Sequence, residues 1–350
     1  MNEYIEAVRA LINNEVLKVD ISDMLYNHKC FYLLSKLNTN NDYYQEIKIK
    51  SIVNKIYIHQ RYNECINLFN RLEMSGIPYA VIKGAILSTI AYGQPYFRFS
   101  NDIDILIDRE NISVVKSIMQ HEGYVQGRIV DNHINLFSRQ EVVFQTAMTH
   151  QTAPFIKKTN NRLCPYLYID INLDILWGEN SKRSDMKYVL QQSQDTKICD
   201  VFTKKLCPEM ELISLCLHHY KDMNSIYLLY HSSLKLSLFC DIYFYIINTE
   251  LNENALYTYC SKLEVSEYIY YCLYYTNLIF SHDKIKKYMS LLYSKNAEQL
   301  IDTFGLTEEE RQYWNVDFFT RLFSTNLRDY LENSLSRELL KKIWTNQQYM

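Results

Sequence analysis

The feature of this sequence that most limits its fold is the position of its strand-like segments, which occur only in the middle of the chain. Residues 79–82 form a short apolar run, and residues 102–107 and 166–176 alternate polar and apolar side chains. Runs of this length and period are typical of buried or half-buried strands. Apolar residues recur at helical spacing on both sides of this region. The pattern predicts an α+β fold, with a small mixed sheet between helical segments.

Helix-stop residues and a change of periodicity indicate how the chain is organised. Gly76, with Pro78 just beyond it, ends the first helical stretch, because glycine and then proline commonly follow a helix. From about Glu209 onward the periodicity is helical almost to the end. We therefore expect three parts: an N-terminal helical segment over residues 1–75, an α/β core over 76–205 and a helical C-terminal domain over 206–350.

Local periodicity predicts further elements inside these parts. Amphipathic spacing predicts helices over residues 86–92 and 111–122, the second ended by Gly123. Residues 125–145 are expected to form a hairpin or loose strands. The charged run from 326 to 344 is expected to form one surface helix.

Composition and charge exclude several classes of protein. The net charge is −3, which does not favour a strongly basic surface for duplex DNA. The nine cysteines show no C-x-x-C spacing, so neither a disulfide framework nor a cysteine zinc site is expected. The N-terminus lacks a signal peptide, and the most apolar window, 234–247, is too short to span a bilayer. We expect a cytoplasmic protein without a membrane partner.

Asp102 and Asp104 are the strongest candidates for a functional site. Residues two apart in a strand project to the same face, so the two carboxylates are expected side by side. Two carboxylates held together repel each other unless a cation lies between them. Mg²⁺ favours such a pair because it binds few carboxylates together with water and phosphate oxygens.

The alternative is that Asp102 and Asp104 form the solvent face of an amphipathic strand, and for a lone Asp-x-Asp this alternative is favoured. Three features favour a site instead. Aspartate is unfavourable in strands, so two in one short strand need a reason. The apolar run 105–107 indicates a central strand rather than an edge. The earlier strand ends in Lys83-Gly84 and opens a helix, and N–H groups at a helix start favour phosphate.

These residues resemble a known family. The segment IPYAVIKGAILSTIAYGQPYFRFSNDIDILID is similar to the uncharacterised nucleotidyltransferase family of bacteria, within the polymerase-beta-like superfamily. The family pattern runs strand, Lys-Gly, helix, an aromatic with a small loop, then Arg four residues before Asp-x-Asp. The matching positions are Lys83, Gly84, Tyr92, Arg98, Asp102 and Asp104. The resemblance covers roughly residues 75–250 and implies a nucleotidyltransferase core.

The resemblance also implies roles for the residues around the Lys-Gly turn. Gly84-Ala85 replaces the superfamily's Gly-Ser or Gly-Gly pair, which removes a hydroxyl that could touch phosphate. Lys83 is expected to steady the triphosphate or to be a solvated charge, and Gly84 allows close backbone approach or is a turn glycine. Arg98 is expected to bind phosphate or to brace the carboxylates. Ser100 is grouped with these phosphate-binding candidates, or it shapes the entry to the strand.

A third carboxylate is expected in the later strand, within IDINLDILWG. The family carries Asp-x-His-Trp there. Asp174 keeps the Trp three residues on, Trp177, but has Leu176 in place of His. Asp170 has Asn172 two residues on and no Trp. Asp170, Asn172 and Asp174 are expected on one strand face. We favour Asp174 slightly, and Asp170 is kept as the alternative.

His218 and Asp241, in the helical part, also match family positions. A buried hydrogen-bonded pair is the favoured role for them, ahead of catalysis. His218-His219 is read as having no third ligand at metal spacing, so zinc is not expected.

The leading hypothesis is a metal-dependent nucleotidyltransferase that moves a nucleotide from a nucleoside triphosphate to a hydroxyl acceptor. The resemblance implies that Asp102, Asp104 and the third aspartate hold two Mg²⁺ ions, with Mn²⁺ as an alternative, and that the third aspartate acts as base. The acceptor is a small molecule, a protein or an RNA end such as tRNA. One alternative is a catalytically decayed nucleotide-binding or protein-interaction module. Another is the toxin of a toxin–antitoxin pair that modifies tRNA or protein.

Overall fold

The computed structural model describes residues 3–37, 42–178 and 182–346. The chain divides into two compact units. One contains Met1–Thr39, Cys216–Tyr243 and Glu253–Met350, and is called here the helical unit. The other contains Asn40–Leu215 and Phe244–Asn252, and is called the sheet unit. The expected boundaries after residues 75 and 205 remain a prediction.

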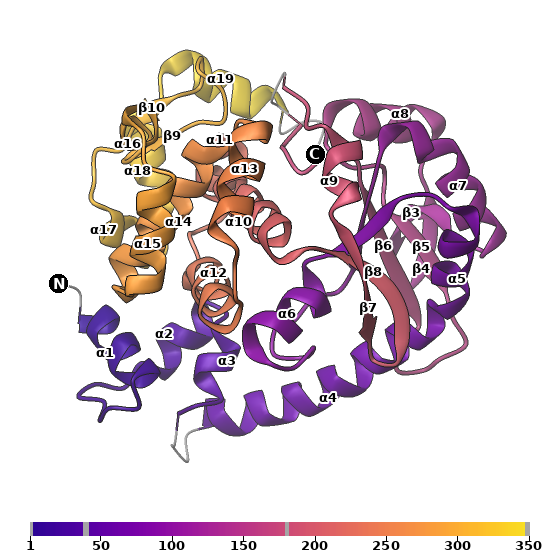
Figure 1. Cartoon of the computed structure of the whole chain (residues 1–350), viewed down its shortest axis with the longest axis horizontal. Helices are drawn as coiled ribbons and strands as arrows, with labels where there is room; N and C mark the ends of the chain where they lie inside the picture. The colour runs from indigo at the N-terminus through magenta and orange to yellow at the C-terminus, as the bar shows by residue number, and fades with distance from the viewer. Residues whose placement is uncertain (1–2, 38–41, 179–181, 347–350) are drawn as a thin grey trace. The chain divides into compact units, whose positions relative to one another are not determined.

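A six-stranded mixed sheet forms the centre of the sheet unit (Figure 1). Its order is β1-β2-β6-β5-β3-β4, in which β2 and β6 are parallel and the other neighbours are antiparallel. The strands of this sheet are β1 (Tyr79–Ile82), β2 (Ile103–Ile107), β3 (Val125–Val130), β4 (His133–Leu136), β5 (Phe155–Lys158) and β6 (Tyr166–Asn172). A separate hairpin pairs β7 (Ser193–Ile198) with β8 (Val201–Leu206).

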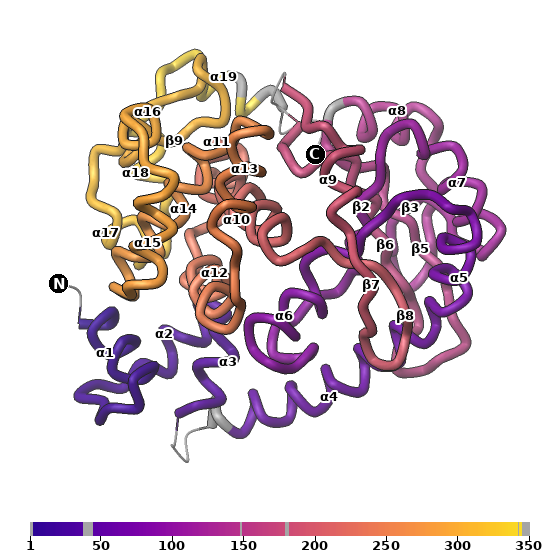
Figure 2. Tube along the Cα trace, in the orientation of Figure 1, coloured from indigo at the N-terminus to yellow at the C-terminus, as the bar shows by residue number. Residues whose placement is uncertain are grey.

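The sheet unit also contains several helices. They are α4 (Asp42–Glu64), α5 (Ile66–Ser75), α6 (Gly84–Tyr92), α7 (Ile112–His121), preceded by the short η1 (Arg109–Asn111), α8 (Arg139–Met148) and α9 (Met186–Gln191). Apolar residues of α4, α5 and α7 form one buried cluster with β1, β2 and β6. The chain can be followed from α5 through α6 to β2 in Figure 2. Because β1 and β2 are buried at every position, the sheet holds the ends of these strands firmly.

The helical unit is built from short helices and one two-stranded ribbon. Its elements are α1 (Glu3–Ile12), α2 (Ser22–Asn27), α3 (Phe31–Leu34), α11 (Ile226–His231), α13 (Glu253–Leu263), α14 (Ser266–Phe280), α15 (Asp283–Leu291), α16 (Lys295–Gln299), β9 (Thr303–Phe304), β10 (Gln312–Tyr313), α17 (Phe318–Phe323), α18 (Leu327–Ser334) and α19 (Arg337–Asn346). Two helices have residues in both units, α10 (Pro208–Asn224) and α12 (Leu236–Asn248).

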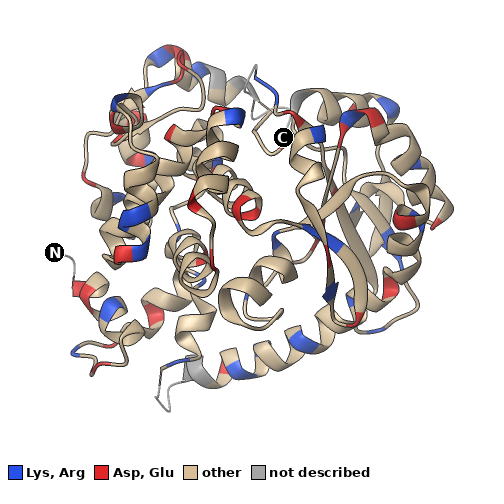
Figure 3. Ribbon diagram, in the orientation of Figure 1, with Lys and Arg blue, Asp and Glu red and all other residues tan. Residues whose placement is uncertain are grey.

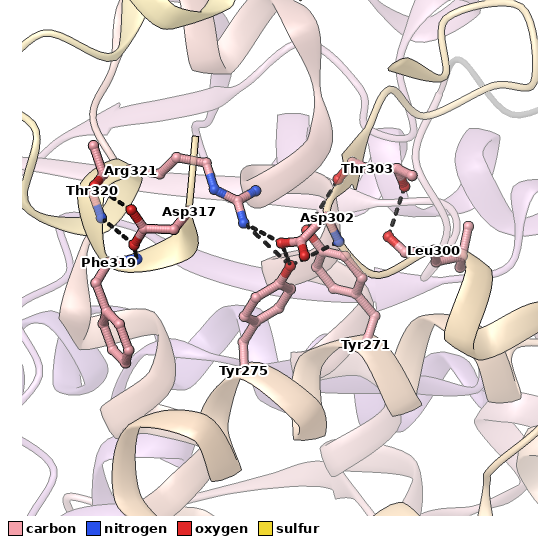
Figure 4. A network of polar contacts seen from close by, with 9 residues as sticks. All are labelled: Tyr271, Tyr275, Leu300, Asp302, Thr303, Asp317, Phe319, Thr320 and Arg321. Atoms are coloured by element: carbon pink, nitrogen blue, oxygen red, sulfur yellow. Dashed lines mark hydrogen bonds and ion pairs between the residues drawn. The ribbon is translucent and has the colours of Figure 1, made fainter. Parts of the chain in front are cut away.

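A buried arginine organises part of the helical unit (Figure 4). Arg321, on α17, donates to Asp302 Oδ1 over 2.8 Å and to the Tyr275 hydroxyl over 3.3 Å. Tyr275 in turn donates to Asp302 Oδ1 over 2.9 Å. The guanidinium carbon also lies 5.0 Å from the centre of the Trp314 ring, at cation–π distance. We call Arg321, Asp302 and Tyr275 the arginine network.

The α+β fold with helices at the N-terminus and a helical C-terminal region is confirmed, while several details of the prediction are wrong. Residues 139–148 form helix α8 rather than strands, and Ser138 and Glu141 start it with a reciprocal capping box. The run from 326 to 344 forms α18 and α19 rather than one helix, because Leu335 between them is extended. Strand β6 ends at Asn172, so Asp174 lies beyond it.

Acidic and basic residues are interspersed along the elements of both units (Figure 3). None of the described helices is long and apolar enough to cross a membrane.

Candidate active site

The parallel pairing of β2 and β6 brings two aspartates together. The register places Asp104 opposite Asp170, and opposite residues in neighbouring strands project to the same face of a sheet. Asp104 is only 7% exposed. Asp102 precedes β2, in the bend that enters the strand. We call Asp102, Asp104 and Asp170 the acidic cluster.

The electrostatics of Asp170 show that the three carboxylates interact. Burial raises its pKa to about 7, with further increases from the charges of Asp104 and Asp102. The positive charge of Lys83 acts in the opposite direction. A carboxyl group with such a pKa keeps its proton near neutral pH unless a cation compensates the cluster. The donor set therefore fits a hard divalent cation such as Mg²⁺.

Neighbouring polar groups fix the orientation of Asp102 and Asp104. The Ser100 hydroxyl donates to Asp102, with Oδ1 at 2.7 Å. The Asn172 amide donates to Asp104 Oδ1 over 3.0 Å and accepts from the Gln151 amide over 2.8 Å. Each contact leaves carboxylate oxygens that can accept a further ligand.

The Lys83-Gly84 turn joins β1 to α6 next to the acidic cluster. Lys83 has φ 57° and ψ −145°, a backbone conformation that costs a non-glycine residue about 1–3 kcal/mol. Its ammonium lies 3.3 Å from Asp104 Oδ1. Gly84 has φ 41°, a backbone conformation that favours glycine. A Cβ there would lie 3.6 Å from Ser100 Oγ, which is an ordinary contact, so lack of space is not the reason for glycine at this position. The side chain of Ala85 is buried, and its backbone N–H belongs to the first turn of α6, where N–H groups have no carbonyl partner within the helix.

Sequence analysis did not identify two residues near this turn, Arg61 and Glu211. Arg61, on α4, is 2% exposed and donates to the carbonyls of Ser100 (2.8 Å) and Asp102 (3.1 Å). Glu211, on α10, accepts the backbone N–H of Lys83, and burial raises its pKa to about 7. Both hold the backbone of the site from helices distant in sequence, and neither belongs to a short motif.

Asp174 lies in a loop rather than on the face shared by Asp170 and Asn172. Its carboxylate accepts the backbone N–H of Leu176 over 3.0 Å and that of Ser184 over 3.3 Å. Burial raises its pKa, which these hydrogen bonds partly offset. The expectation that all three residues share one strand face is therefore wrong. Arg98 lies between α6 and β2, where its backbone N–H donates to Ser88 Oγ over 3.0 Å.

Both histidines of α10 lie close to carboxylates. His219 faces Asp241, with Nε2 at 3.5 Å from Oδ2. His218 Nε2 lies 3.5 Å from Oδ2 of Asp222 on its own helix. Asp222 follows His218 by four residues, so both lie on one helix face. We expected no third ligand at metal-binding spacing from the two histidines. That expectation is wrong, because Asp222 offers a carboxylate oxygen within 4.8 Å of a ring nitrogen of each histidine.

Comparison with known proteins agrees with the resemblance noted in the sequence. No curated protein matches the chain in a sequence search. One similar solved structure is the crystal structure of an antigenic nucleotidyltransferase-like protein from Paracoccidioides brasiliensis. The two sequences are 16% identical, and the match covers 66% of this chain and 93% of that chain, with a TM-score of 0.39. The model of a family described as uncharacterised nucleotidyltransferase matches residues 29–281, well over half of the sequence. The chain belongs to this uncharacterised nucleotidyltransferase family.

Proposed function

We propose that the protein is a metal-dependent nucleotidyltransferase that moves a nucleotide from a nucleoside triphosphate to a hydroxyl acceptor. The observation that carries the proposal is the pairing of Asp104 with Asp170 across β2 and β6, with Asp102 close enough to raise the pKa of Asp170. Three mutually repelling carboxylates next to a Lys-Gly turn and a helix start are suited to bind a metal–triphosphate complex.

The acidic cluster supplies the metal ligands in this proposal. Asp102, Asp104 and Asp170 would hold two Mg²⁺ ions, or Mn²⁺ in their place. When bound, the metal would neutralise charge on the phosphates and on the oxygens that enter and leave. Asp170 would receive the proton of the acceptor hydroxyl, which is the role that the family resemblance implies for the third carboxylate. Asn172 would keep Asp104 in the orientation that this set requires.

The Lys83-Gly84-Ala85 turn supplies the phosphate contacts. Lys83 Nζ lies 3.3 Å from Asp104 Oδ1. Once Asp104 binds a cation, the ammonium can turn to the phosphates, for which lysine acts as a point charge. The backbone N–H groups at the start of α6 would bind phosphate oxygens. We assign Arg98 and Ser100 to the same region, with Ser100 acting through Asp102.

Asp170 is our choice for the third carboxylate in place of Asp174. Asp170 lies beside Asp104, whereas the oxygens of Asp174 accept N–H groups of its own loop. The acceptor is a small molecule, a protein or an RNA end, and the mixed charge along the chain is not suited to duplex DNA.

The experiment is calorimetric titration of each of the four nucleoside triphosphates into the full chain, with and without Mg²⁺. We expect one triphosphate to bind only with Mg²⁺, and Asp104→Asn and Asp170→Asn to abolish that binding. Asp174→Asn is the matched control, since it removes the same charge from a neighbouring buried site, and it should keep the binding. Melting curves confirm that each variant is folded.

The remaining outcomes separate the alternatives. No Mg²⁺-dependent binding of any triphosphate would contradict the proposal and favour a decayed or protein-interaction module. Loss of binding in Asp174→Asn but not in Asp170→Asn would reverse the assignment of the third carboxylate. Growth arrest on expression that Asp104→Asn relieves would support a toxin acting through this site.

A further inference from the structure

A second group of metal-binding side chains lies on α10, in the helical unit and outside the acidic cluster. His218, His219 and Asp222 each offer one ligand atom, and these atoms all lie within 4.8 Å of one another. His218 Nε2 is already 3.5 Å from Asp222 Oδ2. Two ligands bound to one tetrahedral ion at about 2.0–2.2 Å lie roughly 3.3–3.6 Å apart. The His218–Asp222 pair therefore has the separation that such an ion requires.

The environment of His219 is a second observation, independent of the ligand spacing, that points to a bound ion. It is 0% exposed, and neither ring nitrogen has a hydrogen-bond partner. Leaving a buried polar group without a partner costs about 1–3 kcal/mol, and native proteins rarely tolerate it. An ion bound by one ring nitrogen would satisfy that nitrogen directly.

Asp241 supplies the support that a metal-bound histidine usually has. Its Oδ2 lies 3.5 Å from His219 Nε2, and its side chain is almost fully buried. Metal-bound histidines commonly direct their other ring nitrogen to a carboxylate, which fixes the ring and strengthens the ligand. In this arrangement Nε2 of His219 would donate to Asp241, and Nδ1 would bind the ion.

We propose that His218, His219 and Asp222 bind one divalent transition-metal ion of the Zn²⁺ type, with Asp241 orienting His219. Two imidazoles and one carboxylate suit Zn²⁺ and its neighbours, whereas Mg²⁺ and Ca²⁺ prefer all-oxygen sets. The side chains of His218 and Asp222 are 22% and 30% exposed, so the ion can enter from solvent and keep a water ligand. Lys221 Nζ lies 3.5 Å from the other oxygen of Asp222 and offsets part of the charge of that carboxylate.

The test is a calorimetric titration of ZnCl₂ into the metal-free full chain, with excess Mg²⁺ present to occupy the acidic cluster. We expect one Zn²⁺ per chain. His218→Gln and Asp222→Asn should each weaken binding at least about tenfold, and Asp241→Asn should weaken it roughly 10- to 100-fold. Both ligand substitutions are at partly exposed positions, so the fold should survive, which a melting curve checks.

Two controls separate this site from other causes. His121→Gln removes an exposed histidine of α7 and should leave Zn²⁺ binding unchanged. The double variant Asp102→Asn/Asp104→Asn should also bind Zn²⁺ normally, so failure of the proposed function would not affect this result. Co²⁺ in place of Zn²⁺ should give visible absorption that His218→Gln removes. Absence of tight Zn²⁺ binding, or equal binding by wild type, His218→Gln and Asp222→Asn, would overturn the proposal and leave these residues as two ion pairs.

Discussion

The arginine network and the acidic cluster both remove charge from water, but they balance it differently. In the arginine network, one buried guanidinium meets one carboxylate, a tyrosine hydroxyl and aromatic rings. In the acidic cluster, Lys83 lies 3.3 Å from Asp104, and the charges of Asp104 and Asp102 add to the effect of burial in raising the pKa of Asp170. A buried charge with an opposite partner is typical of a structural role, whereas several neighbouring charges of one sign are typical of a site that binds an ion of opposite charge.

The comparison predicts opposite responses to substitution. Removing a charge from the arginine network should destabilise the fold and leave nucleotide binding intact. Removing a carboxylate from the acidic cluster should abolish function and relieve repulsion.

The largest expected effect is on catalysis. Asp170→Asn should lower nucleotide transfer at least about 100-fold, because it removes a metal ligand and the proposed base. In the metal-free protein the same substitution should raise the melting temperature, since it relieves repulsion from Asp104. Turnover assays and calorimetric melting measure the two effects. A variant that loses stability and keeps activity would place Asp170 with the structural residues.

The next effect concerns the arginine network. Asp302→Ala leaves the Arg321 guanidinium buried without its carboxylate, and should lower the free energy of unfolding by about 3–5 kcal/mol. Arg321→Met should cost less, because the Asp302 side chain is 59% exposed and can return to water. Denaturant unfolding of both variants, with nucleotide binding as the control, measures this asymmetry. Equal costs, or a larger cost for Arg321→Met, would show that ring packing rather than charge balance dominates.

His28 shows a third way of handling a buried titratable group, which is to stay neutral. Its Nδ1 accepts the backbone N–H of Leu236 over 3.1 Å. Burial, and then the charge of Lys235, lower its pKa to about 4. A lowered folded pKa means that the unfolded chain binds more protons between pH 6.5 and 4. Stability is therefore complete above pH 6.5 and falls by up to about 3 kcal/mol as the pH drops to 4.

Unfolding curves at pH 7 and pH 5 test the effect of His28. Other groups also titrate in this range, so the comparison is with His28→Asn, which keeps a side-chain acceptor but cannot take up a proton there. The decrease in stability between the two pH values should be smaller in the variant. An identical decrease would show that His28 does not contribute.

An effect of similar size and opposite pH dependence concerns Glu211. Burial raises its pKa to about 7, so the folded protein binds a proton that the unfolded chain lacks between pH 4.5 and 7. Its contribution to stability is present below pH 4.5 and is lost as the pH rises through 7. Glu211→Gln mimics the protonated form and keeps an acceptor for the Lys83 N–H. At pH 8 we expect it to raise the free energy of unfolding by up to about 3 kcal/mol, and at pH 5 to change it little. A decrease at pH 8 would show that the ionised carboxylate is needed.

The sequence predicted the elements whose evidence is local. The alternation of β2, the buried run of β1 and the Gly76 helix stop lie within a few residues, and the structure confirms each. The end of β6 was misjudged because alternation continues past Asn172, whereas the Asp174 hydrogen bonds turn the chain into a loop. Helix α8 was missed although the capping box of Ser138 and Glu141 that starts it is also a local signal.

The site was less accessible to sequence analysis, since tertiary pairing determines it. Asp102, Asp104 and Lys83 occur in one recognisable segment. The position of Asp170 opposite Asp104 depends on which strands pair and in which register. The sequence alone therefore did not decide whether Asp170 or Asp174 is the third carboxylate. Arg61 reaches the site from a helix some forty residues earlier, and no local pattern marks it.

The backbone conformation of Lys83 affects which amino acids natural selection can retain at this position. Its φ of 57° favours glycine, the amino acid that adopts this conformation at least cost. A lineage in which the lysine side chain had become dispensable would gain stability by drifting to glycine. If Lys83 binds the triphosphate as proposed, lysine at this strained position should mark the relatives that retain activity, and glycine should mark those that have lost it.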